Sequence, residues 1–336
     1  MAGKRMARRK RPSRLRSLLI LLLLAAVAAG GAYLYVTREW RGAGPAQKEL
    51  DVSIAEGSTL SSAARQLESA GAIRSRRRFL RLVRMFGPEA PIKAGEYEVP
   101  AHASARDILA LLQAGRTKQR LVAVPEGTPA VIVRDKLMAE PLLTGTVPVP
   151  AEGSVLPDSY SFERGEPRAA VLTRMQLAMN KTLASLWNAR KPTTIAKTPR
   201  EAIILASIVE KETGVAAERR TVAAVYSNRL RQGMRLQADP TVIYPITQGR
   251  PLGRRIRRSE LEADNGYNTY ARAGLPQGPI ANPGKASIAA VLDPADSRAL
   301  YFVADGKGGH VFAETLAEHN GNVQRWYAIR RQRGEM

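Results

Sequence analysis

The chain has 336 residues, 44% of them hydrophobic, which is enough for about two globular domains with real cores. It contains no cysteine, so disulfides, thiolate zinc sites and a cysteine nucleophile are excluded. With three histidines and no HExxH pair, the sequence gives no sign of a zinc hydrolase, and neither GxSxG nor GxxxxGK[ST] occurs.

The net charge of +22 would suit a nucleic-acid partner, but its distribution indicates a membrane. Residues 4–16 carry eight basic residues and no acid, and the next 21 residues, 17–37, carry no charge. A helix of about 20 apolar residues spans a bilayer core, and flanking Lys/Arg mark its cytoplasmic side. We therefore predict a basic cytoplasmic stub over 1–16, a single transmembrane helix over 17–37, a periplasmic remainder after about residue 38, and no nucleic-acid partner.

A cleaved signal peptide is the alternative for this segment, with "AVA" at 26–28 as a small-residue cleavage site. The uncharged run continues past that site, and Tyr33 and Tyr35 stand where interfacial aromatics belong, which favours a retained anchor. The remaining basic excess fits an anionic lipid surface, an anionic wall polymer or a plain solvated face.

A short polar linker over 38–47 precedes a compact α+β module predicted over 48–118. Its helices have Ser58 and Ser104 as N-caps, and Gly115 ends the second of them. The predicted elements are a strand from residue 50 with a turn at Glu56-Gly57, a helix to 70, a basic helix over 76–86, a strand over 94–99 and a helix over 104–115.

The rest of the chain, 119–332, is predicted to form a larger α+β domain, opening with a strand, a Glu-Gly-Thr turn and a helix. Residues 264–294 are dense in Asn, Tyr, Gly and Pro, which suits either carbohydrate binding or plain turns. The other expected elements are an ordered loop over 156–167, helices over 168–188, 198–213 and 216–234, a turn and β-prone run over 235–246, a hairpin over 300–312 and a final helix over 314–332.

The stretch "LASIVEKETG" ends the helix that a capping box at Thr198 begins, and it holds two glutamates. At about 100° per residue, the apolar side chains of 204–209 cluster on one side, and Glu212 lies in the middle of that stripe. A carboxyl against apolar neighbours has a raised pKa and is a usable general acid. The alternative is that Glu212 reaches water at a frayed end. Glu210 points the opposite way and is predicted to be a solvated charge.

Several longer stretches carry a family resemblance. The stretches "ILASIVEKET", "ERRTVAAVYSNRLRQGMRLQADPTVIY", "YNTY", "GLPQGPIANPG" and "YFVADGKGGHVF", the last with a later "HN", resemble the endolytic murein transglycosylase family (MltG, or YceG-like). The resemblance covers nearly the whole chain and is most specific over 204–244. Ala238 stands where the family often has Thr, and Pro245 where it often has Gly.

This resemblance implies an inner-membrane enzyme that cuts nascent peptidoglycan strands internally, between N-acetylmuramic acid (MurNAc) and N-acetylglucosamine (GlcNAc), and leaves 1,6-anhydroMurNAc ends. It implies an α+β fold in which a LysM-like peptidoglycan-binding module over 48–118 precedes a catalytic domain over 119–332. It implies no cofactor and no metal. Peptidoglycan strands are the implied partner, and the synthases that make them are candidate partners.

The family's catalytic glutamate is followed by a hydroxyl residue, which places it at Glu212, before Thr213. The helical wheel selects the same residue independently. The family's other marked motifs supply expected cleft residues whose individual roles are open, namely Gln237, Asp239, Tyr244, Asn268 and Tyr270.

Two other functions stay open from the residues. Asp239 keeps a hydrolytic muramidase possible, because ordinary glycosidases pair two carboxyls to activate water or to form a covalent adduct. A non-catalytic peptidoglycan-binding scaffold would use the 48–118 module alone. A glutamate centred in an apolar stripe is not needed in such a scaffold.

Overall fold

The structure, a computed structural model, describes residues 14–335, and the chain divides into two compact units with the boundary between Lys118 and Gln119. Both units mix helices with small sheets, so the predicted α+β class is confirmed at this level. The three sheets of the described chain are each two-stranded and antiparallel.

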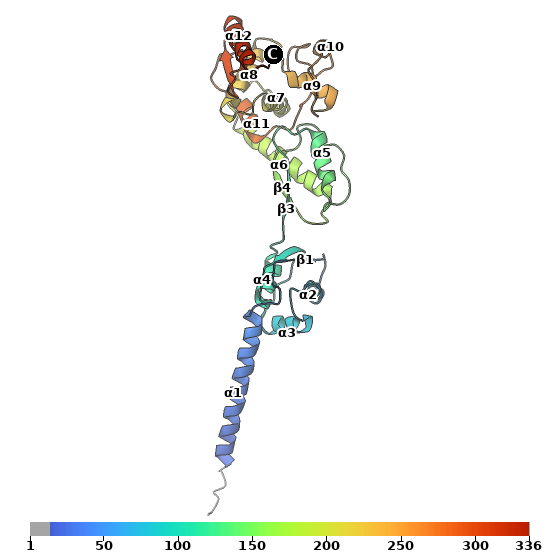
Figure 1. The fold of residues 1–336 in the computed structure, drawn as a ribbon, viewed down its shortest axis with the longest axis vertical. Helices are drawn as coiled ribbons and strands as arrows, with labels where there is room; N and C mark the ends of the chain where they lie inside the picture. The colour runs from blue at the N-terminus through green and yellow to red at the C-terminus, as the bar shows by residue number, and fades with distance from the viewer. Residues whose placement is uncertain (1–13, 336) are drawn as a thin grey trace, which may run out of the picture. The chain divides into compact units, whose positions relative to one another are not determined.

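The first unit begins with α1 (Arg14–Arg41), which is long and apolar enough over Leu18–Arg41 to cross a membrane. Most of the predicted basic stub, residues 1–13, lies outside the described residues. The other elements of this unit are β1 (Leu50–Ile54), α2 (Leu60–Ser69), α3 (Arg76–Phe86), β2 (Gly95–Val99) and α4 (Ala105–Ala114) (Figure 1).

The β1 and β2 strands pair antiparallel from Leu50 opposite Val99 to Ile54 opposite Gly95. The helix α2 packs against β1 and α4 packs against β2, while α3 packs on α2 and α4 and completes the core. The predicted cap at Ser104 is confirmed, because its hydroxyl accepts the Asp107 N–H at 3.2 Å. The predicted cap at Ser58 is wrong, since the next residue along the chain provides the hydroxyl.

In the second unit, α7 (Pro199–Glu212) contacts α8, α9 and α11 and forms one core, while β3, α5, β4 and α6 form a second hydrophobic cluster (Figure 1). The elements of this unit besides α7 are β3 (Arg120–Ala123), α5 (Ala130–Ala139), β4 (Ser159–Phe162), α6 (Arg168–Asn188), the single-turn η1 (Ala216–Glu218), α8 (Arg219–Arg231), α9 (Asp239–Thr247), α10 (Arg258–Glu262), α11 (Lys285–Leu292), β5 (Tyr301–Ala304), β6 (His310–Ala313) and α12 (Leu316–Gln332).

Most of the expected elements are confirmed, including the hairpin of β5 with β6, but two expectations are wrong. The expected loop over 156–167 contains β4, which pairs with β3. The expected β-prone run over 235–246 is the helix α9. Pro240 stands in the first turn of α9, where a missing N–H costs nothing, and Thr241 and Val242 are fully buried, so tertiary packing overrides their strand preference.

Candidate active site

The helix α7 positions Glu212 as its last residue. The Thr198 hydroxyl caps the start of α7 by accepting the Glu201 N–H at 3.1 Å, as the sequence predicts. At the other end, the buried Thr213 hydroxyl accepts the Val215 N–H at 3.0 Å and fixes the turn that follows Glu212. Glu212 is therefore held at the junction of a buried helix and a tied turn.

The turn after Glu212 is tied to the β5–β6 hairpin. The Thr213 hydroxyl lies 3.4 Å from the Glu218 carboxylate, which also accepts the His310 N–H at 2.8 Å. The His310 Nδ1 atom lies 2.7 Å from the same carboxylate. This network restrains the backbone directly after Glu212.

The Glu212 carboxyl is half-buried, and burial raises its pKa to about 7. The negative charge of Asp239 acts in the same direction. A hydrogen bond with Tyr226 and the positive charge of Arg229 oppose the rise, without cancelling it. A carboxyl in this state carries its proton near neutral pH and can still release it.

Tyr226 comes from α8, and its ring is 2% exposed. The sequence places it among inward-facing core residues, and the structure adds a function for its hydroxyl, which bonds to Glu212. The ring makes a T-shaped contact with Phe302 at 6.0 Å between centroids, which also holds the tyrosine in place. Because a buried tyrosine hydroxyl usually has a hydrogen-bond partner, the buried position that the sequence predicts for Tyr226 already indicates a polar neighbour.

Asp239 and Tyr270 form a pair beside Glu212. The Tyr270 hydroxyl donates to the Asp239 carboxylate at 2.6 Å, while Asp239 itself is exposed. Two buried threonines join the segments that carry them, with the hydroxyls of Thr241 and Thr269 only 2.8 Å apart. The negative charge of Glu212 also acts on the pKa of Tyr270, so the structure brings these three predicted residues together.

Asn268 and Gln237, also predicted, lie in the same region. The Asn268 side chain is buried and donates to the carbonyls of Glu260, Leu261 and Ala263 at 3.1, 3.0 and 2.7 Å. Its oxygen accepts the Tyr270 N–H at 2.8 Å, so Asn268 is committed to holding the loop. Gln237 is exposed in a left-handed conformation, with φ of 52°, two residues before Asp239.

Glu210 does not have the solvated position that the helical wheel predicts. Its side chain is 5% exposed, it accepts the Gly284 N–H at 2.8 Å, and it lies 3.7 Å from the Arg219 guanidinium. The reason is that α7 is buried on all sides over residues 202–209, each of which is buried. One apolar stripe therefore does not describe this helix.

The sequence profile of the YceG-like family matches residues 52–325, which includes all of these side chains. The chain belongs to the YceG-like family.

Two curated relatives are similar to this YceG-like chain. A Bacillus subtilis (strain 168) protein named endolytic murein transglycosylase is 31% identical over 55% of this chain and 50% of its own length. A Streptococcus pneumoniae (serotype 2, strain D39) protein with the same name is 28% identical over 82% of this chain and 58% of its own. The chain thus spans about half the length of the curated relatives that it matches.

A crystal structure of a YceG-like protein from Listeria monocytogenes is also similar. The two chains share 27% sequence identity with a TM-score of 0.52, over 82% of this chain and 99% of that one. Among the residues that our structure describes, no group of three or more His, Asp or Glu is arranged to hold a metal ion.

Tyr244, the last of the predicted residues, lines a neighbouring cavity in the second unit of this YceG-like chain, with a volume of about 460 Å³. It stands five residues after Asp239 on α9, and its ring lies 5.0 Å from that of Tyr267. Two tyrosine rings and the polar Gln277 make this cavity suited to a sugar, which offers apolar ring faces and hydroxyls.

Glu152 lines the same cavity, and no motif or periodicity in the sequence selects it. Burial raises the pKa of its carboxyl to about 7, against a hydrogen bond from the Ala130 N–H at 2.9 Å and another with Tyr244. Asn282 contributes a longer contact, at 3.4 Å. This carboxyl therefore joins α5, α9 and the 282 loop.

Proposed function

We propose that this chain is a membrane-anchored endolytic lytic transglycosylase, which cleaves the MurNAc–GlcNAc bond of peptidoglycan strands and leaves 1,6-anhydroMurNAc ends. The observation that carries the proposal is the half-buried Glu212 carboxyl, with a pKa raised to about 7 and the Tyr226 hydroxyl beside it. The names of the two curated relatives support it.

Glu212 acts first as general acid. It gives its proton to the glycosidic oxygen while the bond from that oxygen to the muramyl C1 breaks and positive charge develops at C1. The C6 hydroxyl of the same muramyl residue then attacks C1, and the Glu212 carboxylate accepts the hydroxyl proton. One C–O bond breaks and one forms, no water is consumed, and Glu212 ends protonated again.

The other site residues support this chemistry. The Asp239 charge helps to keep Glu212 protonated before the reaction, and Tyr270 fixes Asp239 from across the loop. Asn268 positions Tyr270, and the exposed Gln237 and Asp239 can bind substrate hydroxyls. The cavity of Tyr244 and Tyr267 provides a place for a second sugar ring of the strand.

A hydrolytic muramidase is the second candidate, and one observation favours it. Asp239 is an exposed carboxylate that interacts electrostatically with Glu212, so it could activate a water molecule. The lytic reaction consumes no water, whereas a muramidase adds one water to each cut. The products of the two candidate reactions therefore differ in mass.

The layout of the chain completes the proposal. We assign α1 as a retained single-pass anchor with a cytoplasmic N-terminus, since the charge step at residues 16–17 orients it. Residues 48–118 form a LysM-like module that binds glycan strands weakly, and peptidoglycan synthases are candidate partners. Protease added to spheroplasts should digest the bulk of the protein. Survival of the protein until lysis would show that the orientation is wrong.

The deciding experiment digests purified glycan strands with the full chain and weighs the products. The proposed reaction gives ends one water lighter than the reducing ends that a hydrolase makes. Reducing ends would support the muramidase. Strands that stay intact with a folded protein, yet bind to it, would support a non-catalytic scaffold.

A further inference from the structure

The helix α3 carries a charge pattern that the proposed glycan chemistry does not use. It has five arginines in eleven residues and no acid. Arg77, Arg81 and Arg84 recur at the i, i+4, i+7 spacing and form one exposed stripe, while Phe79 and Leu82 are buried on the opposite face. Like charges at this spacing weaken an isolated helix. In the described chain the three stripe arginines form no ion pair, so an external anion would relieve their repulsion.

The first unit holds α3 at the end of α1. The Trp40 ring of α1 stacks on Phe86 at the end of α3, with 6.1 Å between centroids, and Trp40 is 5% exposed. Trp40 stands three residues past the uncharged run that ends at Thr37, about 5 Å along the helix axis. The headgroup layer on each side of a bilayer core is about 5–7 Å thick. A membrane that α1 crosses therefore has its headgroups level with α3.

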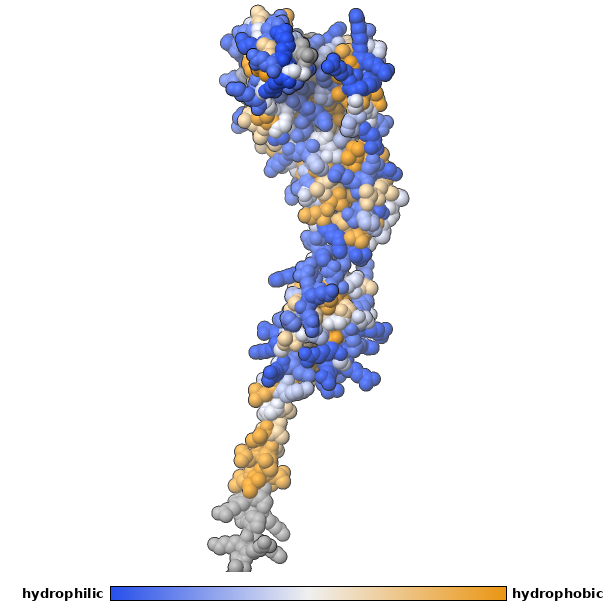
Figure 2. Space-filling model, in the orientation of Figure 1, coloured by the Kyte–Doolittle hydropathy of each residue, from blue (hydrophilic) through white to orange (hydrophobic). Residues whose placement is uncertain are grey.

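The surface of α1 is consistent with this placement. None of its apolar window is buried in the folded part of the chain, and Figure 2 shows it as a continuous hydrophobic surface. The folded part of the first unit is mostly hydrophilic on the face that Figure 2 shows, and α3 carries five arginines. Lipid is the environment that this helix requires, and phosphate groups are the charges next to it.

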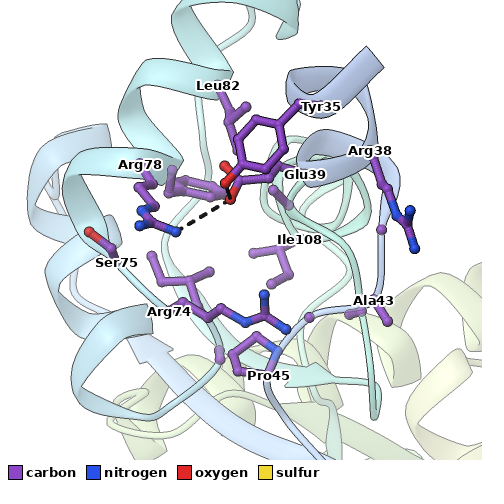
Figure 3. A pocket seen from close by; sticks show the side chains of 17 residues that line it. Tyr35, Arg38, Glu39, Ala43, Pro45, Arg74, Ser75, Arg78, Leu82 and Ile108 are labelled. Carbon is purple, nitrogen blue, oxygen red and sulfur yellow. Dashed lines mark hydrogen bonds and ion pairs between the residues drawn. The ribbon is translucent and has the colours of Figure 1, made fainter. Parts of the chain in front are cut away.

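A pocket of about 510 Å³ lies between α1 and α3 (Figure 3). Glu39 on its wall accepts hydrogen bonds from the Tyr35 hydroxyl at 3.1 Å and from Arg78 at 3.3 Å, which fixes both side chains. The Arg74 guanidinium extends into the pocket, and Arg38 stands at its rim. With Arg78 balanced by Glu39, two positive charges remain for an anionic group.

We propose that the arginine stripe of α3 and this pocket bind the phosphate headgroups of anionic phospholipids, in the leaflet next to the folded part of the chain. The site holds the first unit against the membrane surface. The inference rests on the membrane anchoring proposed above and not on glycan cleavage.

The test uses the full chain in nanodiscs of phosphatidylcholine alone, or of phosphatidylcholine with phosphatidylglycerol, and follows amide hydrogen exchange over residues 74–86. Exchange should be slower with phosphatidylglycerol, and raising the salt to about 1 M should remove the difference. One arginine near the surface favours binding to an anionic membrane over a neutral one by about fivefold, so three arginines favour it on the order of 100-fold. The triple variant Arg77→Gln, Arg81→Gln, Arg84→Gln should lose most of this difference, and the part that remains should depend on the pocket arginines.

A matched control is the triple variant Arg235→Gln, Arg255→Gln, Arg331→Gln, which neutralises three exposed arginines of the second unit and should keep the wild-type difference. The single variant Arg74→Glu tests the pocket and should lose part of the protection. Equal exchange of the wild type in both discs would overturn the site. Protection by inorganic phosphate in discs of phosphatidylcholine alone would show a small-anion site instead. Failure of the chain to enter either disc would refute the anchor and this site with it, whereas loss of glycan cleavage alone would leave both standing.

Discussion

The Tyr226 hydroxyl hydrogen-bonds to the Glu212 carboxyl and so links α8 to the last residue of α7. This interaction favours the charged form of the Glu212 carboxyl, whereas burial favours the protonated form. Because these effects oppose each other, the proton on Glu212 is retained near neutral pH but is not locked in place.

Replacing Glu212 with glutamine should abolish most of the cleavage. Glutamine keeps the size of the side chain but has no proton to give, and a positioned general acid contributes about 10²–10⁴-fold to a rate. The loss should lie at the upper end because the residue acts twice. The rate of strand cleavage is the measurement, and Glu262→Gln, an exposed residue of α10, is the matched control. Full activity of a folded Glu212→Gln protein would remove Glu212 from the mechanism.

Replacing Tyr226 with phenylalanine should raise the pKa of Glu212 further, because the lost hydrogen bond stabilises the carboxylate. The alkaline limb of the kcat/KM profile against pH should move up by about one pH unit. Tyr327→Phe, on the exposed side of α12, should leave the profile unchanged. A shift toward lower pH in Tyr226→Phe would mean that the hydroxyl acts in another way.

Replacing Asp239 with asparagine should move the same limb in the opposite direction. The negative charge of Asp239 raises the pKa of Glu212, so a neutral side chain lets that pKa fall. At pH values below the shifted alkaline limb, the variant should still produce anhydro ends at a measurable rate. Complete loss of cleavage at every pH would instead indicate that Asp239 takes part in the chemistry, as a muramidase requires.

The stability of the second unit should fall as the pH rises from about 4.5 through 7. Burial raises the pKa values of both Glu152 and Glu212 to about 7 from 4.5, so within this window the folded state binds more protons than the unfolded state. Their stabilising contribution is complete below the unfolded pKa and is lost above the folded one. Thermal melting at several pH values measures this. The double variant Glu152→Gln, Glu212→Gln should show a flatter dependence, and an unchanged slope would contradict the assignment.

Replacing Glu210 with alanine should destabilise the second unit by about 2 kcal/mol, because it leaves the buried Gly284 N–H without its acceptor and Arg219 with Glu126 as its one carboxylate partner among the described residues. Glu314→Ala provides the matched control, since that carboxylate pairs with an arginine whose side chain is 86% exposed. Melting temperatures of the two variants give the comparison. Equal melting would mean that the Glu210 contacts contribute little.

The sequence alone leads to Glu212, although the helical wheel describes its surroundings incompletely. The wheel assumes one buried face, and it therefore places Glu210 in solvent. The structure buries α7 on all sides, because α8, α9 and α11 surround it, and no periodicity of one helix reports how many neighbours it has. The caps at Thr198 and Ser104 were predictable because they depend only on residues within one turn.

Two site residues could not be found from local pattern. Glu152 stands in a segment rich in Pro and Gly, and Tyr244, one of its partners, lies more than ninety positions further along the chain. Tyr226 lies on the apolar stripe of α8, where burial of its ring is enough to explain a tyrosine, so the pattern does not indicate a function for its hydroxyl. The helix α9 was missed for a related reason, since Thr241 and Val242 favour a strand locally and only the completed core buries them in a helix.

The position of Glu212 at the end of α7 has one more effect on the reaction. The peptide dipoles of a helix add up to about half a negative charge at its C-terminus and half a positive charge at its N-terminus. Glu212 is the last residue of α7, whereas Asp239 is the first residue of α9. In the proposed reaction, the anion that remains after proton donation therefore faces an unfavourable backbone field. That field favours capture of the proton of the C6 hydroxyl, and the step that closes the anhydro ring also restores the acid.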